Sequence, residues 1–412
     1  MKKILFFCSA YPYGHTGPSN NSTVRVMEAL VRTGEFEVYN VSYSPHGNGD
    51  AQNYKLVEGV KQIMIPYSEN NTRHSRLFQR MMAFLRIPIY PLTVSAIINT
   101  WRNYKGCRKV LKNENYDILI SQFNPFESWA AGALLRKNKY VSKHIVLSWD
   151  IIYGKAHHAI IPNAFAIRRQ RILLNWLAHY TDKIATIYSQ KKYHEQYGDV
   201  PAAINKRVYL GIPSVVSPET IKTKDNSDFI KAKCLNFIYA GSIYSESDLE
   251  YAVNLLNATT FANQINLILL CKDPSMPLLQ KLTTSFKGTI RLSKWITVEA
   301  LYSLYSQVDV LLSFSGKGSW GVPGKTYEYM SFGKPILHFF KNENDVNIPL
   351  FGPYPLFKGI NVTKPIYENQ LVIEDFINKS KGKHVSFDEV EHLFPYATMT
   401  AYINMIKDFV KQ

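Results

Sequence analysis

The chain has 412 residues, which is more than one hydrophobic core usually organises, so two domains of ordinary size are expected. Its 46% hydrophobic and 19% charged residues exclude a largely disordered or fibrous protein. The 48 Lys and Arg residues against 32 Asp and Glu residues leave a formal charge of +16, which favours an anionic partner: nucleic acid, an acidic membrane surface or a phosphorylated small molecule.

Short apolar runs separated by segments with helical spacing predict a first α/β domain over residues 1–212. Each run leads into a loop and then into a helical pattern, as at residues 22–32, which is typical of a parallel sheet with crossover helices. The run at residues 3–8 is too short for a signal peptide, so we interpret it as a first buried strand. The expected strands are residues 3–8, 36–42, 60–66, 116–121, 144–148 and 183–187.

Two segments of this first domain lack acidic residues and combine basic with apolar side chains. One extends over residues 70–113, and the other, residues 151–181, contains Arg168, Arg169 and Arg171. Such segments suit an anionic membrane leaflet, whereas apolar faces packed on the core with arginines outside would give the same pattern. The expected membrane contacts are Arg73, Arg76, Arg80 and Arg86, together with Phe78, Met82 and Phe84.

A polar stretch at residues 217–228 suits a linker or an exposed loop, and after it the alternation of apolar runs and helical patterns restarts. We therefore expect a second α/β domain over residues 213–394 and a separate final helix within residues 395–412. The two domains would face a cleft. The expected strands of the second domain are residues 236–241, 264–270, 288–292, 308–314 and 334–339.

Signals of several other protein classes are missing from the sequence. The four cysteines are scattered, without C-x-x-C or metal-ligand spacing, so no disulfide framework or zinc site is indicated and a reducing compartment fits best. The longest apolar region, residues 81–100, is interrupted by Arg86, Pro88 and Pro91, so no transmembrane segment is expected. Neither G-x-x-x-x-G-K-[ST] nor a strand-linked G-x-G-x-x-G occurs, which argues against P-loop and ordinary dehydrogenase sites.

The densest cluster of glycines lies between Phe314 and Phe340, directly after an expected strand. A helix is expected to begin near Pro323, with Lys325 in its first turn and Glu328 one turn further along. Ligands of open α/β sheets bind at the carboxyl ends of strands, so Lys325 would neutralise a diphosphate and Glu328 would accept hydrogen bonds from two ribose hydroxyls. The alternative is a connector with a surface lysine and a glutamate that only complements the helix dipole.

The segment Pro-Gly-Lys-x-Tyr-Glu-Tyr-Met-x-x-Gly-Lys-Pro-Ile resembles the nucleotide-binding motif of GT-B fold glycosyltransferases of the family 4 type. Residues 237–242, 294–299 and 305–310 are similar to other landmarks of that family's second domain, and residues 116–121 and 181–186 occupy the expected order in the first. The resemblance implies two Rossmann-like domains, a nucleotide sugar held by the second domain, retention of anomeric configuration, and no metal or other cofactor.

Two positions depart from the family pattern. Relatives carry Glu-x7-Glu, whereas here Trp320 takes the first position and Glu328 keeps the second. Relatives also place an Arg and a Lys after the glycine turn of the second domain, whereas Ser242 and Ile243 follow Gly241 here. Lys325 and backbone N–H groups would then have to neutralise the diphosphate, which implies either altered donor binding or lost activity.

The strand ends and the resemblance together define a set of expected site residues. No catalytic His carries over in the first domain, because Asn124 stands near that position, and Asp150 would either contact the acceptor or cap the next segment. Trp295 would either wall the base pocket or be part of the core. The expected catalytic residues are Asn124, Asp150 and Ser319, and the expected donor-binding residues are Gly17, Gly241, Ser242, Lys272, Trp295, Ile296, Gly318, Trp320, Gly321, Lys325 and Glu328.

The sequence thus predicts a cytoplasmic glycosyltransferase, peripheral on the inner face of the membrane. It would move a sugar from a nucleotide donor to a glycan or lipid-linked acceptor in polysaccharide or glycoconjugate biosynthesis. No recognised nucleic-acid motif occurs, so nucleic acid is not an expected partner. Two alternatives on the same fold remain open: a catalytically silent glycan-binding or scaffold protein, and a sugar-nucleotide epimerase, which would need acid/base carboxylates and histidines around the sugar.

Overall fold

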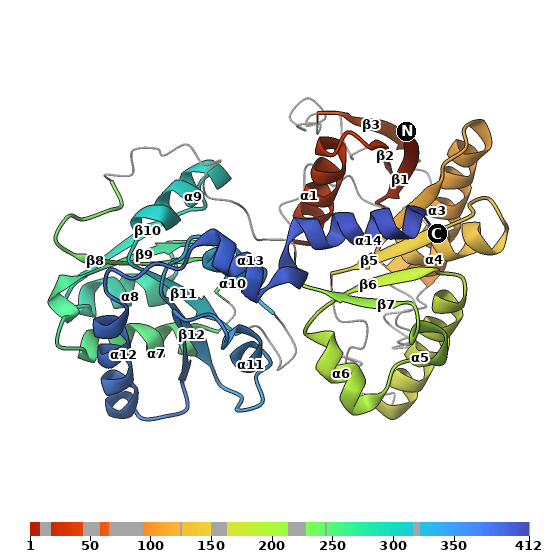
Figure 1. Cartoon of the computed structure of the whole chain (residues 1–412). Coiled ribbons are helices and arrows are strands. Elements are labelled where there is room, and N and C mark those ends of the chain that lie inside the picture. The colour runs from red at the N-terminus through yellow and green to blue at the C-terminus, as the bar shows by residue number, and fades with distance from the viewer. Residues whose placement is uncertain are drawn as a thin grey trace. The chain divides into compact units, whose positions relative to one another are not determined.

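Figure 1 shows the computed structural model, which describes residues 1–8, 18–43, 58–65, 94–123, 126–149, 163–212, 228–243, 245–315 and 322–411. The chain forms two compact units. The first comprises Met1–Pro213 and Met399–Gln412, and the second comprises Ser214–Thr398. Within the described residues, no helix combines the length and the apolar character needed to cross a membrane.

The first unit contains a parallel sheet of seven strands in the order β3-β2-β1-β4-β5-β6-β7. The order reverses between β1 and β4, which makes this pair the switch point of a doubly wound fold. The central strands are buried on both faces and therefore read as the apolar runs of the sequence. The strands are β1 (Lys2–Phe7), β2 (Phe36–Tyr43), β3 (Val60–Ile65), β4 (Ile118–Phe123), β5 (His144–Ser148), β6 (Lys183–Ile187) and β7 (Arg207–Leu210).

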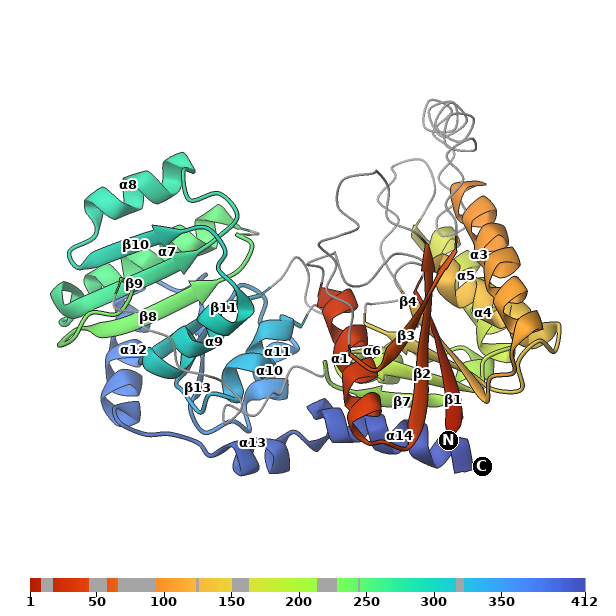
Figure 2. The ribbon, with the colours of Figure 1, turned by 90° about the horizontal axis from the view of Figure 1, so that it is seen from above.

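Helices cover both faces of this sheet (Figure 2). One face packs on α1 (Pro18–Arg32) and α14 (Met399–Lys411), and the other packs on α3 (Val94–Asn113), α4 (Phe126–Lys137) and α5 (Asn163–His179). A short helix, α6 (Gln190–Tyr197), follows β6.

The last helix, α14, belongs to the first unit although the second unit precedes it in the chain. It buries Tyr402, Ile406 and Phe409, whose spacing of four and three residues places them on one helix face. The hydroxyl of Tyr402 donates to the carbonyl of Gly211 at 2.7 Å, and the ammonium of Lys143 donates to the carbonyl of Phe409 at 2.9 Å. The helix was expected as a separate segment, and its apolar face explains why it packs on a domain instead.

The second unit repeats the architecture with a parallel sheet of six strands in the order β10-β9-β8-β11-β12-β13. The strand order reverses between β8 and β11, where Ile238 lies opposite Leu311. Leucines, isoleucines and valines of α7, α8 and α12 pack against one face of this sheet. The strands are β8 (Leu235–Ala240), β9 (Ile265–Leu270), β10 (Thr289–Ser293), β11 (Val310–Phe314), β12 (Ile336–Phe340) and β13 (Phe357–Asn361). The helices are α7 (Glu246–Ala258), α8 (Pro277–Ser285), α9 (Val298–Gln307), α10 (Gly324–Met330), α11 (Asn347–Phe351), α12 (Ile366–Ser380) and α13 (Phe387–Leu393).

Three aspartates that stand immediately before strands join neighbouring strands at the amino ends of the two sheets. Asp117 accepts a hydrogen bond from the backbone N–H of Lys3 at 2.7 Å. Asp182 does the same for His144 at 2.8 Å, and Asp309 for Asn236 at 2.7 Å. These aspartates lie in segments that resemble family landmarks. In the structure they join neighbouring strands at their amino ends, whereas ligands of such sheets bind at the carboxyl ends.

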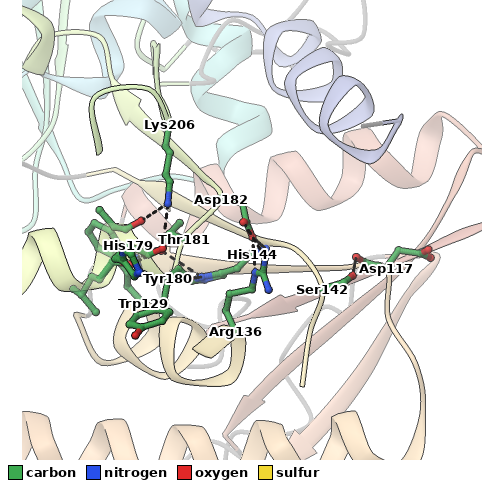
Figure 3. Close-up of polar contacts among 12 residues, drawn as sticks. Asp117, Trp129, Arg136, Ser142, His144, His179, Tyr180, Thr181, Asp182 and Lys206 are labelled. Atoms are coloured by element: carbon green, nitrogen blue, oxygen red, sulfur yellow. Dashed lines mark hydrogen bonds and ion pairs between the residues drawn. The ribbon is translucent and has the colours of Figure 1, made fainter. Parts of the chain in front are cut away.

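A polar network surrounds His144 at the amino end of β5 (Figure 3). The imidazole Nε2 lies 2.7 Å from the hydroxyl of Ser121, and Nδ1 lies 3.3 Å from the carbonyl of Tyr180. Arg136 donates to both carboxylate oxygens of Asp182, at 2.9 and 3.2 Å. Burial lowers the pKa of His144 to about 4 although the carbonyl of Tyr180 and the charge of Asp182 favour its protonation. The network therefore holds a neutral histidine.

Candidate functional site

The turn after β8 is held by side chains from two directions. The hydroxyl of Tyr239 donates to the carbonyl of Ser242 at 2.6 Å, and the ammonium of Lys325 donates to the carbonyl of Ala240. A Cβ on Gly241 would lie only 2.9 Å from the hydroxyl oxygen of Tyr239, so a side chain there would disturb the turn. Because β8 is one of the two strands at which the sheet order reverses, this turn lies at the switch point where open α/β sheets bind ligands.

Helix α10 carries the two charged residues that the sequence singles out. It begins at Gly324, with Pro323 as its N-cap, as predicted. Lys325 and Glu328 are three residues apart and therefore lie on the same side of the helix. Burial lowers the pKa of Lys325, and the nearby carboxylate of Glu328 partly opposes this effect. A desolvated ammonium at the switch-point turn is a group that an anionic ligand would stabilise.

Glu328 is 9% exposed, and its carboxylate contacts Tyr302 of α9. Its Oε2 accepts a hydrogen bond from the hydroxyl of Tyr302 at 3.1 Å. The rings of Tyr302 and Tyr305 both pack on Phe332, with centroid distances of 5.5 and 5.3 Å, and Tyr305 packs edge-on against Tyr329 at 5.0 Å. We call Tyr302, Tyr305, Tyr329 and Phe332 the aromatic cluster. Of this cluster, Tyr302 contacts the carboxylate, and the other rings hold Tyr302 in place.

A second buried histidine, His338 in β12, links β11 to the loop before α11. Its Nε2 lies 3.0 Å from the hydroxyl of Ser315, which donates to the carboxylate of Asp345. Its Nδ1 lies 3.0 Å from the hydroxyl of Ser313, which is 3.0 Å from the hydroxyl of Thr326 in α10. Burial lowers the pKa of His338 to about 4, although the charge of Asp345 favours protonation.

The positions of the hydrogen atoms in this series of hydrogen bonds follow from Asp345, whose carboxylate can only accept. Since Ser315 donates to Asp345, its oxygen accepts from His338, and the proton of the neutral imidazole is on Nε2. Nδ1 then accepts from Ser313, and Ser313 accepts from Thr326. These hydrogen bonds thus connect Asp345 to α10, the helix that carries Lys325 and Glu328.

The remaining described residues of the expected donor site lie after β9 and β10. Trp295 is 50% exposed, so the alternative that it belongs to the core is wrong. Lys272 is exposed, and Ile296 is half-buried. The backbone N–H of Cys271 donates to the carbonyl of Ser293 at 3.1 Å, which joins the ends of the two strands. Lys272 and Trp295 therefore follow neighbouring strand ends, as a wall of a base pocket would require.

Several expected site residues lie outside the described residues. These are Gly17, Asn124, Asp150, Gly318, Ser319, Trp320 and Gly321, together with the membrane contacts Arg73, Arg76, Phe78, Arg80, Met82, Phe84 and Arg86 and residues 217–227 of the polar stretch. In the second acid-free segment, Arg171 donates to the carbonyls of Tyr197, Gly198 and Asp199. Its guanidinium therefore stabilises the end of α6, a structural role that was not expected.

Sequence reasoning missed two polar residues near the donor-site turn. Tyr302 is one, and its position three residues before Tyr305 on a buried helix face was the only signal. The other is Lys341, whose ammonium lies 2.5 Å from Asp248 and 3.1 Å from the hydroxyl of Ser247 in the first turn of α7. It brings a positive charge to the segment after β8, where the sequence has no base of its own. Its position two residues after an expected strand could have identified it.

In the part of the chain that the structure describes, no group of three or more His, Cys, Asp and Glu side chains could hold a metal ion. The four cysteines are unpaired thiols. Burial raises the pKa of Cys8 and of Cys107 to about 12, so both are protonated at neutral pH. These thiols are therefore poor nucleophiles and poor metal ligands.

No protein-family model and no curated protein matches the chain. Solved structures do. The lipopolysaccharide outer core galactosyltransferase WaaB is 15% identical with a TM-score of 0.58, and Anabaena HepE in complex with UDP is 10% identical with a TM-score of 0.64; the match covers 100% of each chain in both cases. The Neisseria meningitidis UDP-GlcNAc 2-epimerase bound to UDP-GlcNAc is 14% identical over 100% of both chains, with a TM-score of 0.59.

This chain has the GT-B fold. Two doubly wound parallel sheets match glycosyltransferase structures along their whole length, as expected from the sequence. The same fold also occurs in the epimerase, so the fold by itself leaves the reaction open.

Proposed function

We propose that this protein is a glycosyltransferase that uses a nucleotide sugar, with the donor nucleotide bound by the second unit. The observation that carries the proposal is the position of Lys325 and Glu328 on α10, beside the turn after β8 at the switch point of the sheet. In this proposal Lys325 contacts the diphosphate, and Glu328 accepts hydrogen bonds from the ribose hydroxyls. Similar structures with UDP and UDP-GlcNAc support a nucleotide sugar as the ligand.

The remaining parts of the donor site follow the same logic. Trp295 would lie beside the base, with Lys272 and Ile296 near it, and Gly241 and Ser242 would line the diphosphate. Lys341 would supply part of the positive charge that the family pattern places after β8. Gly17, Gly318, Trp320 and Gly321 would complete the donor site, while Asn124, Asp150 and Ser319 would act around the reacting sugar. We further propose a retaining reaction that needs no metal or other cofactor.

An epimerase is less well supported, because it needs acid/base groups beside the sugar. His338 is fully buried, with serine hydroxyls at both ring nitrogens, so it is unsuited to exchange protons with a substrate. A catalytically silent protein is favoured by Trp320 and by the missing base after Gly241. The pair of Lys325 and Glu328 argues against it, since a scaffold has no need of both groups on the ligand side of the sheet.

Nucleotide titrations test the donor site directly. We expect Lys325→Ala and Glu328→Ala each to weaken binding of the preferred nucleoside diphosphate by ~10- to 100-fold, since a hydrogen bond to a charged group contributes roughly 1.5–3 kcal/mol. Lys341→Ala should weaken it less, by about 1 kcal/mol, and mainly at low salt. Lys379→Ala, which removes an exposed ammonium of α12, serves as the control. Wild-type affinity in both of the first two variants would refute the assignment.

Product analysis separates the three reactions. The purified protein is incubated with a panel of nucleotide sugars, and the released nucleotide and sugar are identified by NMR. Slow hydrolysis of one donor with the α or β configuration retained supports a retaining glycosyltransferase. Conversion to an epimeric nucleotide sugar would establish the epimerase, and tight binding without turnover, with or without a glycan acceptor, would establish the silent protein.

We also propose that the acceptor is a glycan or lipid-linked molecule and that the first unit docks on an anionic membrane surface on the cytoplasmic side. Helix α3 has no acidic residue, and it carries Ile97 and Trp101, each 52% exposed, four residues apart. The ammonium of Lys105 lies 5.2 Å from the centre of the Trp101 ring. Exposed apolar side chains followed by lysines are a pattern that binds anionic lipid interfaces.

Vesicle sedimentation tests this surface. The protein should pellet with anionic but not with neutral vesicles, and salt should release it. Ile97→Ser with Trp101→Ser should reduce pelleting, and Lys105→Glu with Lys109→Glu should abolish it, without a change in nucleotide affinity. Tyr367→Ser with Leu371→Ser is the matched control, because these side chains are similarly exposed on α12 of the second unit. Equal pelleting with both kinds of vesicle, or with neither, would contradict membrane docking.

A further inference from the structure

Tyr302 contacts the carboxylate that the proposed function assigns to the ribose. Its hydroxyl donates to Oε2 of Glu328 at 3.1 Å in a buried environment, and the two residues are 26 positions apart in the chain. The Tyr302 ring is 7% exposed and is itself packed against Tyr305 and Phe332, with centroids 6.2 and 5.5 Å away. The hydroxyl therefore has a defined position relative to α10.

A glutamate needs such a partner if it is to select a diol. Its side chain has three rotatable bonds, and two adjacent hydroxyls are bound well only when the carboxylate plane has one orientation. Each carboxylate oxygen has two acceptor sites, so Oε2 can accept from Tyr302 and still accept a second hydrogen bond. A hydrogen bond from a packed tyrosine thus orients the carboxylate and occupies only one of its acceptor sites.

We propose that Tyr302 is a positioning residue that orients Glu328 for the ribose and so determines how well the protein distinguishes ribonucleotides from deoxyribonucleotides. This inference rests on the proposed role of Glu328. Tyr302 does not touch the nucleotide; it acts through the carboxylate. A tyrosine that only filled space behind α10 would keep the helix in place for every nucleotide equally, so the two roles differ in what they do to the preference between sugars.

The test measures that preference in Tyr302→Phe, which keeps the ring and removes only the hydroxyl. UDP, 2′-deoxy-UDP and 3′-deoxy-UDP are titrated into wild type, Tyr302→Phe and Glu328→Gln, with ADP and GDP and their deoxy forms used if the wild type prefers those bases. Tyr305→Phe is the matched control, because it removes a hydroxyl from the same aromatic cluster on the same helix. Thermal unfolding of each variant shows whether the second unit remains folded.

We expect Tyr302→Phe to reduce the preference for the ribonucleotide by ~5- to 10-fold, the loss of about one hydrogen bond, while affinity for the deoxy forms stays close to that of wild type. Tyr305→Phe should leave the preference unchanged. An equal loss of affinity for all three nucleotides in Tyr302→Phe, or an unchanged preference, would overturn the positioning role while the donor site stands. If Glu328→Gln also keeps the full preference, or if no nucleotide binds, the donor assignment itself fails and this inference fails with it.

Discussion

His144 and His338 are both fully buried, but they lie at different places along their strands. His144 is the first residue of β5, at the amino ends of the strands of the first sheet, and its partners cap strands and helices. His338 lies in β12, and its hydrogen bonds run from Asp345 to Thr326 on the helix that carries Lys325 and Glu328. Burial lowers the pKa of each to about 4.

Burial and a lowered pKa therefore do not by themselves mark a functional residue in this fold. The network of His144 ends in Asp182 and Arg136 and in the carbonyls at the end of α5, all of which stabilise the sheet edge away from any strand-end ligand. The network of His338 ends on α10. A change in the first network should therefore alter stability only, whereas a change in the second should alter stability and nucleotide binding together.

Acid should give the largest effect, and it should act on both histidines. An imidazole has an ordinary pKa of about 6.5, so between pH 6.5 and 4 the unfolded chain binds protons that the folded chain excludes. The stabilisation is fully present above pH 6.5 and is lost as the pH falls towards 4, by about 3 kcal/mol for each histidine. Urea unfolding at pH 7 and pH 4.5 measures it.

His144→Gln and His338→Gln should each make the stability less dependent on pH, in the unit that carries the substitution. The two units have separate cores, so their unfolding transitions are analysed separately. A pH dependence that is the same in wild type and in both variants would mean that neither histidine is excluded from protonation by the fold.

Replacing Asp345 or Asp182 tests whether only the hydrogen bonds of His338 affect nucleotide binding. Asp345→Ala deprives Ser315 and the side-chain and backbone N–H groups of Asn347 of an acceptor, at a cost of about 2–3 kcal/mol to the second unit. It should also weaken nucleotide binding. Asp182→Ala should cost a similar amount in the first unit, since it leaves Arg136 and the N–H of His144 without their acceptor, and nucleotide affinity should not change. Equal effects of the two variants on affinity would show that the hydrogen bonds of His338 have no special link to the nucleotide site.

The smallest effect is spectroscopic, because it changes a proton position and hardly any free energy. The carbonyl of Tyr180 can only accept, so the neutral ring of His144 carries its proton on Nδ1, whereas that of His338 carries it on Nε2. Imidazole ¹⁵N shifts of histidine-labelled protein should show one tautomer of each kind, assigned with the Gln variants. The same tautomer at both sites would contradict the hydrogen-bond directions derived for His338.

The central strands and the main charged pair could be predicted because their signals are local. Strands such as β5 and β9 are buried on both faces, so most of their residues are apolar. The edge strands β7 and β13 were missed, since most of their residues are only half-buried and need no such run. Gly324 and Pro323 placed the start of α10, and helix geometry alone put Lys325 and Glu328 on one side.

Local signals in the sequence were therefore enough to predict most of the strands, the two doubly wound sheets, and the pair of Lys325 and Glu328 on one helix. The tertiary structure decided which residues support that pair. Tyr302 meets Glu328 across 26 positions, Lys341 meets Ser247 across 94, and His338 meets Ser313 across 25. It also decided that Trp295 is exposed and that α14 joins the first unit. The reason is physical: periodicity depends on neighbours along the chain, whereas hydrogen-bond partners depend on which strands the sheet places side by side.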